Sequence, residues 1–281
     1  MTDAKSLLPR FEERFAELRG SRLRYFVAGE GNAIVLVHGL GGAATNWTLL
    51  APALARQRRV VIPDLPGHGG SQPLPAVPNL NVFADRVALL AEREGASPAA
   101  IVGHSFGGVV ALRLALRHPG VVSRLVLAAT AGISSTTRRA EYSLRIVGLV
   151  KPGKLIAPFR DRVAGSARLR SLAFGHWSVS DPAAFSPRAA SGFLEGPPLH
   201  TDTVSAALAL VRDDPRPDLH ELGCPCLVLW GARDAQLPLS DAYDYARRLR
   251  APLRVIADCG HLLIGERPEA CLDAIEEFLA A

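Results

Sequence analysis

The chain has 281 residues, of which 48% are hydrophobic, and its 32 Lys or Arg against 27 Asp or Glu give a net charge of +5. This length and composition exclude a disordered protein and predict one α/β domain that carries an insertion. The four Cys are too few for a disulfide framework, so we expect buried thiols. The spacing of the His and Cys residues is not that of a metal site.

The start of the chain lacks the basic, apolar and small-residue segments of a signal peptide, and no run of about 18 uncharged apolar residues occurs. We therefore expect a cytoplasmic protein without a membrane span. The positive charge has no interleaved aromatic residues and no recognition-helix pattern, so nucleic acid is not an expected partner.

The first segment has apolar residues three and four apart, namely Leu8, Phe11, Phe15 and Leu18. This spacing predicts an N-terminal amphipathic helix over residues 1–20. Residues 22–27 then predict an edge strand. Residues 34–37 are continuously apolar, which is typical of a strand covered on both faces.

A glycine-rich loop at residues 38–42 follows that strand. We expect a short helix next, with apolar residues Trp47, Leu50 and Leu54, and then a strand over residues 59–63. The loop at residues 64–71 is rich in Gly and Pro. The helix that follows it is marked by Phe83, Val87 and Leu90.

Residues 99–108 predict a strand, a sharp turn on Ser105 and a helix. At such an elbow the serine hydroxyl is held clear of the sheet, and the chain passes too close for a Cβ atom at Gly103 and Gly107. The helix that begins at Phe106 directs its free N–H groups at the same point. Ser105 is therefore a candidate nucleophile.

Strands are predicted over residues 125–128, 226–230 and 253–256, and a closing helix carries Cys271, Ile275, Phe278 and Leu279. Strands that alternate with helices at this spacing predict a mostly parallel sheet of about eight strands with helices on both faces. The site then lies at the carboxyl ends of the strands.

Three motifs, in order and with the expected spacing, resemble those of the α/β-hydrolase family: His38-Gly39, Asp64-Leu65-Pro66-Gly67-His68-Gly69, and Gly103-His104-Ser105-Phe106-Gly107-Gly108. The resemblance covers nearly the whole chain. Because the residue at the elbow is a serine, the chain resembles the esterase-like branch of the family, whose nucleophile is serine. The resemblance implies a core at residues 21–130 and 206–281 and a helical lid at residues 131–205. The resemblance also implies that the acid follows the seventh strand and the histidine the eighth.

Residues 131–200 hold ten Lys or Arg against four Asp or Glu, a net charge of +6. The charge is typical of a solvated helical face and is also compatible with an anionic substrate. A helix over residues 140–150 and several short helices between prolines are expected. The pocket or the lid's own core would be lined by Leu149, Phe159, Phe174, Trp177 and Phe193.

A serine hydroxyl needs a base with a pKa near 7, and the base needs an acid that holds its tautomer. His261 follows the last strand, and Asp234 is preferred as the acid over Asp258, because a residue so near His261 usually points along its own strand. His38 and His68 are expected to have structural roles. Solvated or capping roles are expected for the remaining candidates His118, His176, His200 and His220.

The expected reaction is attack by Ser105 on a carbonyl carbon, with His261 as base, Asp234 as acid, and the backbone N–H groups of Leu40 and Phe106 binding the oxyanion. No metal or organic cofactor is required. The substrate is then a small ester, thioester or lactone. Two alternatives stay open. The first is another enzyme with the same triad, namely a C–C hydrolase of anionic ring-fission products, a cofactor-free perhydrolase or an acyltransferase. The second is a ligand-binding protein that retains the triad. The oligomeric state is not predicted.

Overall fold

The computed structural model describes residues 4–75, 79–134 and 156–281. Its strands form one eight-stranded sheet in the order β1-β2-β4-β3-β5-β6-β7-β8. The strands are β1 (Glu12–Leu18), β2 (Ser21–Ala28), β3 (Ala33–Val37), β4 (Arg59–Pro63), β5 (Ala99–His104), β6 (Val122–Ala128), β7 (Cys226–Gly231) and β8 (Leu253–Ile256). Strands β3 to β8 are parallel, whereas β1 and β2 are antiparallel to their neighbours, which confirms the mostly parallel sheet.

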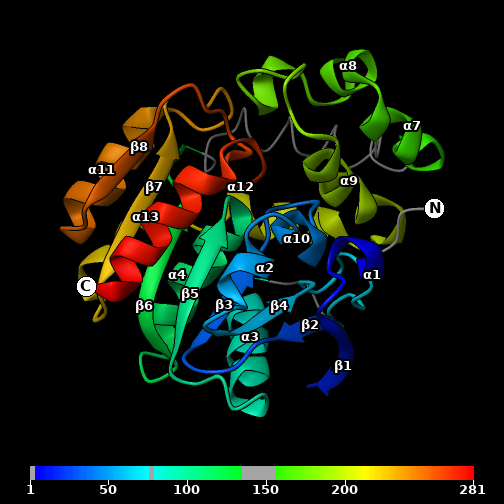
Figure 1. Ribbon diagram of the computed structural model, residues 1–281. Helices are drawn as coiled ribbons and strands as arrows, with labels where there is room; N and C mark the ends of the chain where they lie inside the picture. The colour runs from blue at the N-terminus through cyan, green and yellow to red at the C-terminus, as the bar shows by residue number, and fades with distance from the viewer. Residues whose placement is uncertain (1–3, 76–78, 135–155) are drawn as a thin grey trace.

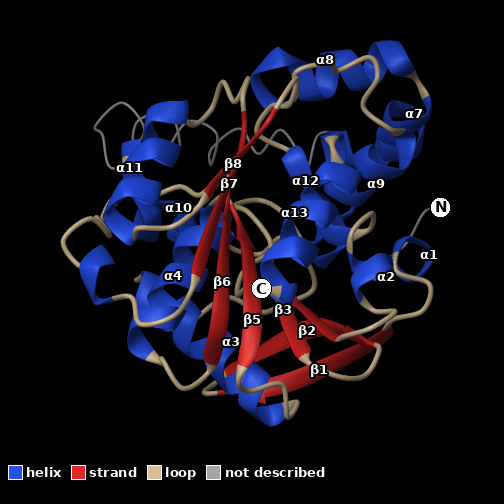
Figure 2. Ribbon diagram, turned by 60° about the vertical axis from the view of Figure 1, so that its left-hand side comes forward, coloured by secondary structure: helices blue, strands red, loops and turns tan. Residues whose placement is uncertain are grey.

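Helices cover both faces of the sheet, with α4 (Phe106–Arg117), α10 (Thr203–Val211) and α11 (Leu239–Leu249) on one side and α13 (Pro268–Ala280) on the other (Figure 2). Every residue of β5 and β7 is therefore buried, which agrees with their apolar sequences; His104 at the end of β5 is the polar exception. The helices are α1 (Ala4–Leu7), α2 (Ala51–Leu54), α3 (Leu80–Arg93), α4 (Phe106–Arg117), α7 (Arg160–Gly165), α8 (Ala167–Ser178), α9 (Pro187–Glu195), α10 (Thr203–Val211), α11 (Leu239–Leu249), α12 (Leu263–Glu266) and α13 (Pro268–Ala280). None of these described helices is long and apolar enough to cross a bilayer.

The N-terminal amphipathic helix predicted over residues 1–20 is wrong. The described part of this segment has one helical turn, α1, and then the edge strand β1, which pairs with β2 over its full length. The chain reverses at Arg19 and Gly20, whose φ values of 46° and 80° are both positive, as in a two-residue hairpin turn. Cross-strand pairing therefore overrides the helical spacing of the apolar residues.

The same hairpin corrects the prediction of an edge strand at residues 22–27. Strand β2 lies between β1 and β4, and only two of its eight residues are not buried. Phe15, part of the predicted apolar stripe, is 42% exposed and lies under the Arg22 guanidinium, 4.1 Å from its ring centroid. This contact covers part of an aromatic ring on the exposed side of the edge strand.

Between β6 and β7 the chain leaves the sheet, and its helices α7, α8 and α9 lie above the carboxyl ends of the parallel strands (Figure 1). They have a small apolar core of their own, which includes Val163, Phe174, Phe185 and Leu194. Short helices were expected here. The helix predicted over residues 140–150 lies outside the described residues.

The predicted pocket-lining residues separate into two groups. Phe174 is 7% exposed and, with Phe193, packs in the core of the α7–α9 segment, whereas Phe159 and Trp177 are 60% and 61% exposed. Leu149 lies outside the described residues. Phe174 thus belongs to the segment's own core, Phe193 packs against both that core and the core around the sheet, and two others face solvent.

Candidate active site

Ser105 occupies a tight turn between β5 and α4, with φ 54° and ψ −117°. A positive φ is strained for a residue with a side chain, so the surrounding structure must hold it. The Ser105 amide donates to the Ala128 carbonyl at 2.9 Å, and the Ser105 carbonyl accepts from Gly108 and Ala131. These bonds tie the turn to the end of β6 and to the first turn of α4.

Two glycines make this turn possible. A Cβ atom on Gly103 would lie 2.3 Å from the Gly107 carbonyl oxygen, and one on Gly107 would lie 2.3 Å from the carbonyl oxygen of Val37. Atoms cannot approach so closely, so both positions exclude any larger residue. The strand, the turn and the helix consequently pack with their backbones in contact.

His261 and Asp234 meet Ser105 from two other loops. His261 follows β8 and Asp234 follows β7, and the structure places His261 Nε2 3.0 Å from Ser105 Oγ and His261 Nδ1 2.8 Å from Asp234 Oδ2. A carboxylate only accepts, so Nδ1 carries the proton and Nε2 accepts from the serine hydroxyl. The side chains of His261 and Asp234 are 5% and 0% exposed.

The competing acid, Asp258, does not contact His261. Its carboxylate pairs with the Arg233 guanidinium at 2.6 Å on the surface, where its side chain is 61% exposed. Asp234 is instead held by backbone amides, since its Oδ1 accepts from Gln236 at 2.8 Å and Leu237 at 2.9 Å. The carboxylate from the neighbouring strand is the one that faces the imidazole.

The backbone amides of Leu40 and Phe106 lie on the two segments that approach Ser105. A Cβ atom on Gly39 would lie 3.2 Å from Ser105 Cβ, which shows how closely the turn that carries Leu40 passes. Phe106 is the first residue of α4, where N–H groups have no acceptor within the helix. Within the described residues neither amide has a hydrogen-bond acceptor. Both can therefore donate to a bound oxyanion.

His104 packs against the His261 ring and is hydrogen-bonded to the His261 backbone. Its Nε2 lies 2.9 Å from the His261 carbonyl oxygen and donates to it, and the two ring centroids are 5.2 Å apart. Burial lowers the pKa of His104 to about 3, so the ring is neutral. Its Nδ1 is buried without a hydrogen-bond partner in the described part of the chain.

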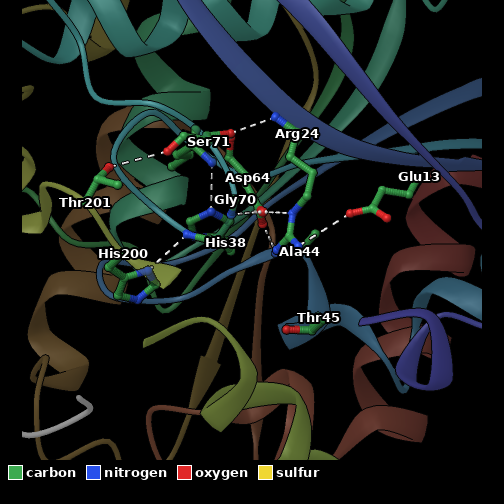
Figure 3. Close-up of polar contacts among 12 residues, drawn as sticks. Glu13, Arg24, His38, Ala44, Thr45, Asp64, Gly70, Ser71, His200 and Thr201 are labelled. Carbon is green, nitrogen blue, oxygen red and sulfur yellow. Dashed lines mark hydrogen bonds and ion pairs between the residues drawn. The ribbon is translucent and has the colours of Figure 1, made fainter. Parts of the chain in front are cut away.

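A second polar cluster surrounds the Asp64 carboxylate (Figure 3). The Asp64 carboxylate, whose side chain is 0% exposed, accepts from Arg24 Nε at 2.5 Å, the Ala44 amide at 2.7 Å and the Gly70 amide at 2.8 Å. Strand β2, the segment at Ala44 and the loop at residues 64–71 are thus tied together by one buried carboxylate. The pairing with Arg24 compensates part of the cost of burying its charge.

Histidines complete this cluster. His38 donates from Nδ1 to the Gly39 carbonyl and accepts at Nε2 from the Leu65 amide, and His68 Nδ1 lies 3.0 Å from the Pro66 carbonyl. These contacts confirm the expected structural roles of His38 and His68. His200 caps the C-terminal end of the 3₁₀ helix Pro197–Leu199, as expected of a capping role, but its imidazole is not simply solvated, because it bridges Gly41 and Gly69. The partners of His200 lie too far away in the sequence for a local pattern to reveal them.

Three of the four cysteines are buried, and Cys224 is partly buried; none forms a disulfide. Burial raises the pKa of the Cys259 thiol, so this neighbour of His261 stays protonated and unreactive. Across the described ranges no group of three or more His, Cys, Asp or Glu is arranged to hold a metal ion.

Comparison with known proteins extends these observations. Residues 34–274 match the model of the alpha/beta hydrolase family. The chain is 32% identical to 2-hydroxymuconate semialdehyde hydrolase of Pseudomonas sp. (strain CF600), over 93% of this chain and 91% of that protein. It is 34% identical to pimeloyl-[acyl-carrier protein] methyl ester esterase of Aromatoleum aromaticum, over 88% and 97%.

A thermophilic esterase from Thermogutta terrifontis has a similar structure, with a TM-score of 0.74, 27% identity, and coverage of 96% of this chain and 98% of that one. The eight-stranded sheet is consistent with the fold of the family whose model matches residues 34–274. The similarity to these hydrolases supports the conclusion that the protein is an enzyme. The chain belongs to the alpha/beta hydrolase family.

Proposed function

We propose that the protein is a serine hydrolase that cleaves a carboxylic ester, thioester or lactone through an acyl-enzyme on Ser105. The observation that carries the proposal is the hydrogen-bonded series from Ser105 Oγ through His261 to Asp234, with distances of 3.0 and 2.8 Å. A nucleophile, a base and an orienting acid in this order are what acyl transfer needs.

In the first half of the reaction, Ser105 Oγ attacks the substrate carbonyl carbon and its proton passes to His261 Nε2. Asp234 stabilises the imidazolium that forms. The carbonyl oxygen becomes an oxyanion, which accepts hydrogen bonds from the amides of Leu40 and Phe106. The positive end of α4 adds to this stabilisation.

In the second half, the intermediate collapses and the leaving group takes the proton from His261 Nε2. A water molecule then attacks the acyl-enzyme while Nε2 accepts one of its protons. The second tetrahedral intermediate expels Ser105, which regains that proton, and the carboxylic acid is released.

Esters are the first choice of substrate because the pimeloyl-carrier-protein esterase and the thermophilic esterase are among the similar proteins. C–C hydrolysis is the second candidate, supported by the similarity to 2-hydroxymuconate semialdehyde hydrolase. Three of the insertion's ten Lys or Arg residues already have partners within the protein, so these three add little to that candidate. Arg160 pairs with Glu195, Arg170 donates to the Ala164 carbonyl, and Arg188 donates to that of Leu7.

We further infer that residues 131–205 form a lid over the site. The support is the position of α7, α8 and α9 above the carboxyl ends of the strands, where Ser105 also lies (Figure 1). A lid there would exclude water and shape the pocket for the acyl group.

Labelling with a fluorophosphonate tests the proposal directly. We expect wild-type protein to be labelled on Ser105, and Ser105→Ala and His261→Ala to lose both labelling and hydrolysis of p-nitrophenyl esters, by about 10⁶-fold in kcat. Ser171→Ala is the matched control, since that exposed hydroxyl only donates to the Ala167 carbonyl. Wild-type protein that neither labels nor turns over any acyl substrate would favour a binding protein.

A substrate panel separates the two candidate reactions. We expect p-nitrophenyl acetate and butyrate to be cleaved at higher kcat/KM than 2-hydroxymuconate semialdehyde. The reverse order would assign the site to C–C hydrolysis by the same side chains.

A further inference from the structure

The amide of Leu40 lies in a four-residue turn, residues 39–42. The Gly42 amide donates to the Gly39 carbonyl at 3.0 Å, which closes the turn, and Gly41 at its third position has φ 68°. A positive φ there is typical of a turn that needs glycine. The shape of this turn decides where the Leu40 N–H lies relative to Ser105.

Two histidines hold the carbonyl groups of the turn. His38 Nδ1 donates to the Gly39 carbonyl at 2.8 Å. The C=O and N–H of one peptide unit lie in one plane and point in opposite directions, so this bond orients the Leu40 N–H. His200 Nε2 lies 2.7 Å from the Gly41 carbonyl oxygen, on the other end of the turn.

The hydrogen-bond partners define the tautomer of His200. Its Nδ1 lies 3.0 Å from the Gly69 amide nitrogen, which can only donate, so Nδ1 is the acceptor. The proton is therefore on Nε2, which donates to Gly41. One imidazole therefore joins the turn at residues 39–42 to the loop at residues 64–71.

The backbone around His200 is anchored without its imidazole. The amides of Thr201 and Asp202 both donate to the Gly67 carbonyl at 3.0 Å. Further up the chain, the Gly192 carbonyl accepts from Thr45 Oγ1 at 2.8 Å and Asn46 Nδ2 at 3.1 Å. The segment stays in place through these bonds. To these bonds the imidazole adds its hydrogen bonds to the Gly41 carbonyl and from the Gly69 amide.

We propose that His200 is a positioning residue for the oxyanion-binding amide of Leu40. It clamps the turn at residues 39–42 against the loop at residues 64–71 and so keeps the Leu40 N–H aimed at the carbonyl oxygen of the substrate. This inference rests on the proposed acyl transfer at Ser105. The imidazole of His200 bonds Gly41 and Gly69, so its effect on the reaction is exerted through the backbone.

Substitution of His200 by Gln or by Asn distinguishes the effects of its two hydrogen bonds, because each side-chain amide can replace only one ring nitrogen. The Gln side-chain nitrogen reaches the place of Nε2, so His200→Gln keeps a donor for Gly41; the Asn side-chain oxygen takes the place of Nδ1, so His200→Asn keeps only the acceptor for Gly69. Loss of an oxyanion donor costs about 10²- to 10³-fold in kcat, and a misaligned donor costs less. We expect kcat for p-nitrophenyl acetate to fall about 10-fold or more in His200→Asn with KM nearly unchanged, and to stay within about 3-fold in His200→Gln.

The kcat of each variant is calculated per active site, and the concentration of active sites is measured by titration with a fluorophosphonate. Unfolded protein therefore does not lower the kcat value. A second measurement is amide hydrogen exchange at Leu40, Gly41 and Gly42 in protein without substrate. Exchange faster in His200→Asn than in His200→Gln is expected if the imidazole orders the turn.

Equal kcat values in the two variants, whether unchanged or equally reduced, would overturn the assignment to the Gly41 carbonyl. Unchanged exchange at the turn in His200→Asn would do the same. A wild-type protein that is inactive and unlabelled refutes the proposed function instead, and the exchange data still decide whether His200 orders the turn.

Discussion

Asp234 uses its two carboxylate oxygens for different tasks. Oδ2 faces His261 Nδ1, while Oδ1 accepts from two backbone amides of its own loop. The loop thereby fixes the carboxylate, and the carboxylate fixes the ring. A single substitution can separate these tasks, because Asn keeps one acceptor oxygen and replaces the other with a donor.

Asp234→Asn is therefore expected to fold normally, with the amide oxygen on the backbone N–H groups and the amide nitrogen facing His261. The ring then favours the tautomer with its proton on Nε2, which cannot accept from Ser105. We expect kcat for ester hydrolysis to fall about 10⁴-fold. Asp258→Asn is the control and should leave kcat unchanged; equal losses in the two variants would contradict the assignment of the acid.

At the scale of the elements, the elbow depends on the contact of three backbones: the end of β5, the start of α4 and the end of β3. A Cβ atom on Gly103 would meet the Gly107 carbonyl at 2.3 Å, and backbone atoms cannot move aside as a flexible side chain can. The strain at Ser105 is held by this packing.

Gly103→Ala should consequently destabilise the fold by about 3 kcal/mol, since either the strand or the helix must shift. Gly120→Ala is the matched control, because a Cβ atom there would meet nothing within 4 Å. We expect its free energy of unfolding to lie within about 0.5 kcal/mol of the wild-type value. Urea denaturation measures both, and equal stability of the two variants would refute the packing argument.

At the scale of the whole molecule, three histidines besides His261 are buried as neutral rings. Burial lowers the pKa of His38 to about 3, lowers that of His104 to about 3, and lowers that of His68 well below 6.5. In the unfolded chain each ring titrates near 6.5. Below that pH the unfolded state binds more protons than the folded one, so stability rises with pH in this range.

The free energy of unfolding should therefore be highest above pH 6.5 and fall as the solution is acidified toward pH 5. Each buried ring contributes up to about 1.4 kcal/mol per pH unit. His104→Gln keeps a donor for the His261 carbonyl but does not titrate, so its stability curve should be flatter. Urea denaturation at pH 7, 6 and 5 provides the comparison; parallel curves for variant and wild type would refute the role of His104.

Local patterns in the sequence predicted most of the sheet, because apolar runs followed by glycine loops mark buried strands. The elbow was predictable for the same reason: Gly103, Ser105 and Gly107 lie within five residues. The catalytic roles of Ser105, Asp234 and His261 stay predictions, although the structure brings their side chains into contact.

Pairings over long distances in the sequence were not predictable. The helical spacing of the first apolar residues concealed the strand β1, and the Arg19-Gly20 turn between apolar segments was the signal that could have revealed the hairpin. The bond from His200 to Gly41 has no local signal, because 159 residues separate its partners. Which carbonyl an imidazole meets depends on tertiary structure.

The apolar core of the α7–α9 segment is separate from the core around the sheet, and among the described residues Leu49 and Phe193 pack against both. A small core of this kind gives its segment a lower free energy of local opening than that of global unfolding. We expect native-state hydrogen exchange to show two cooperative units, with α8 exchanging before β5; identical protection would contradict this. A large acyl substrate could then reach Ser105 by sub-global opening, while the sheet keeps the catalytic groups assembled.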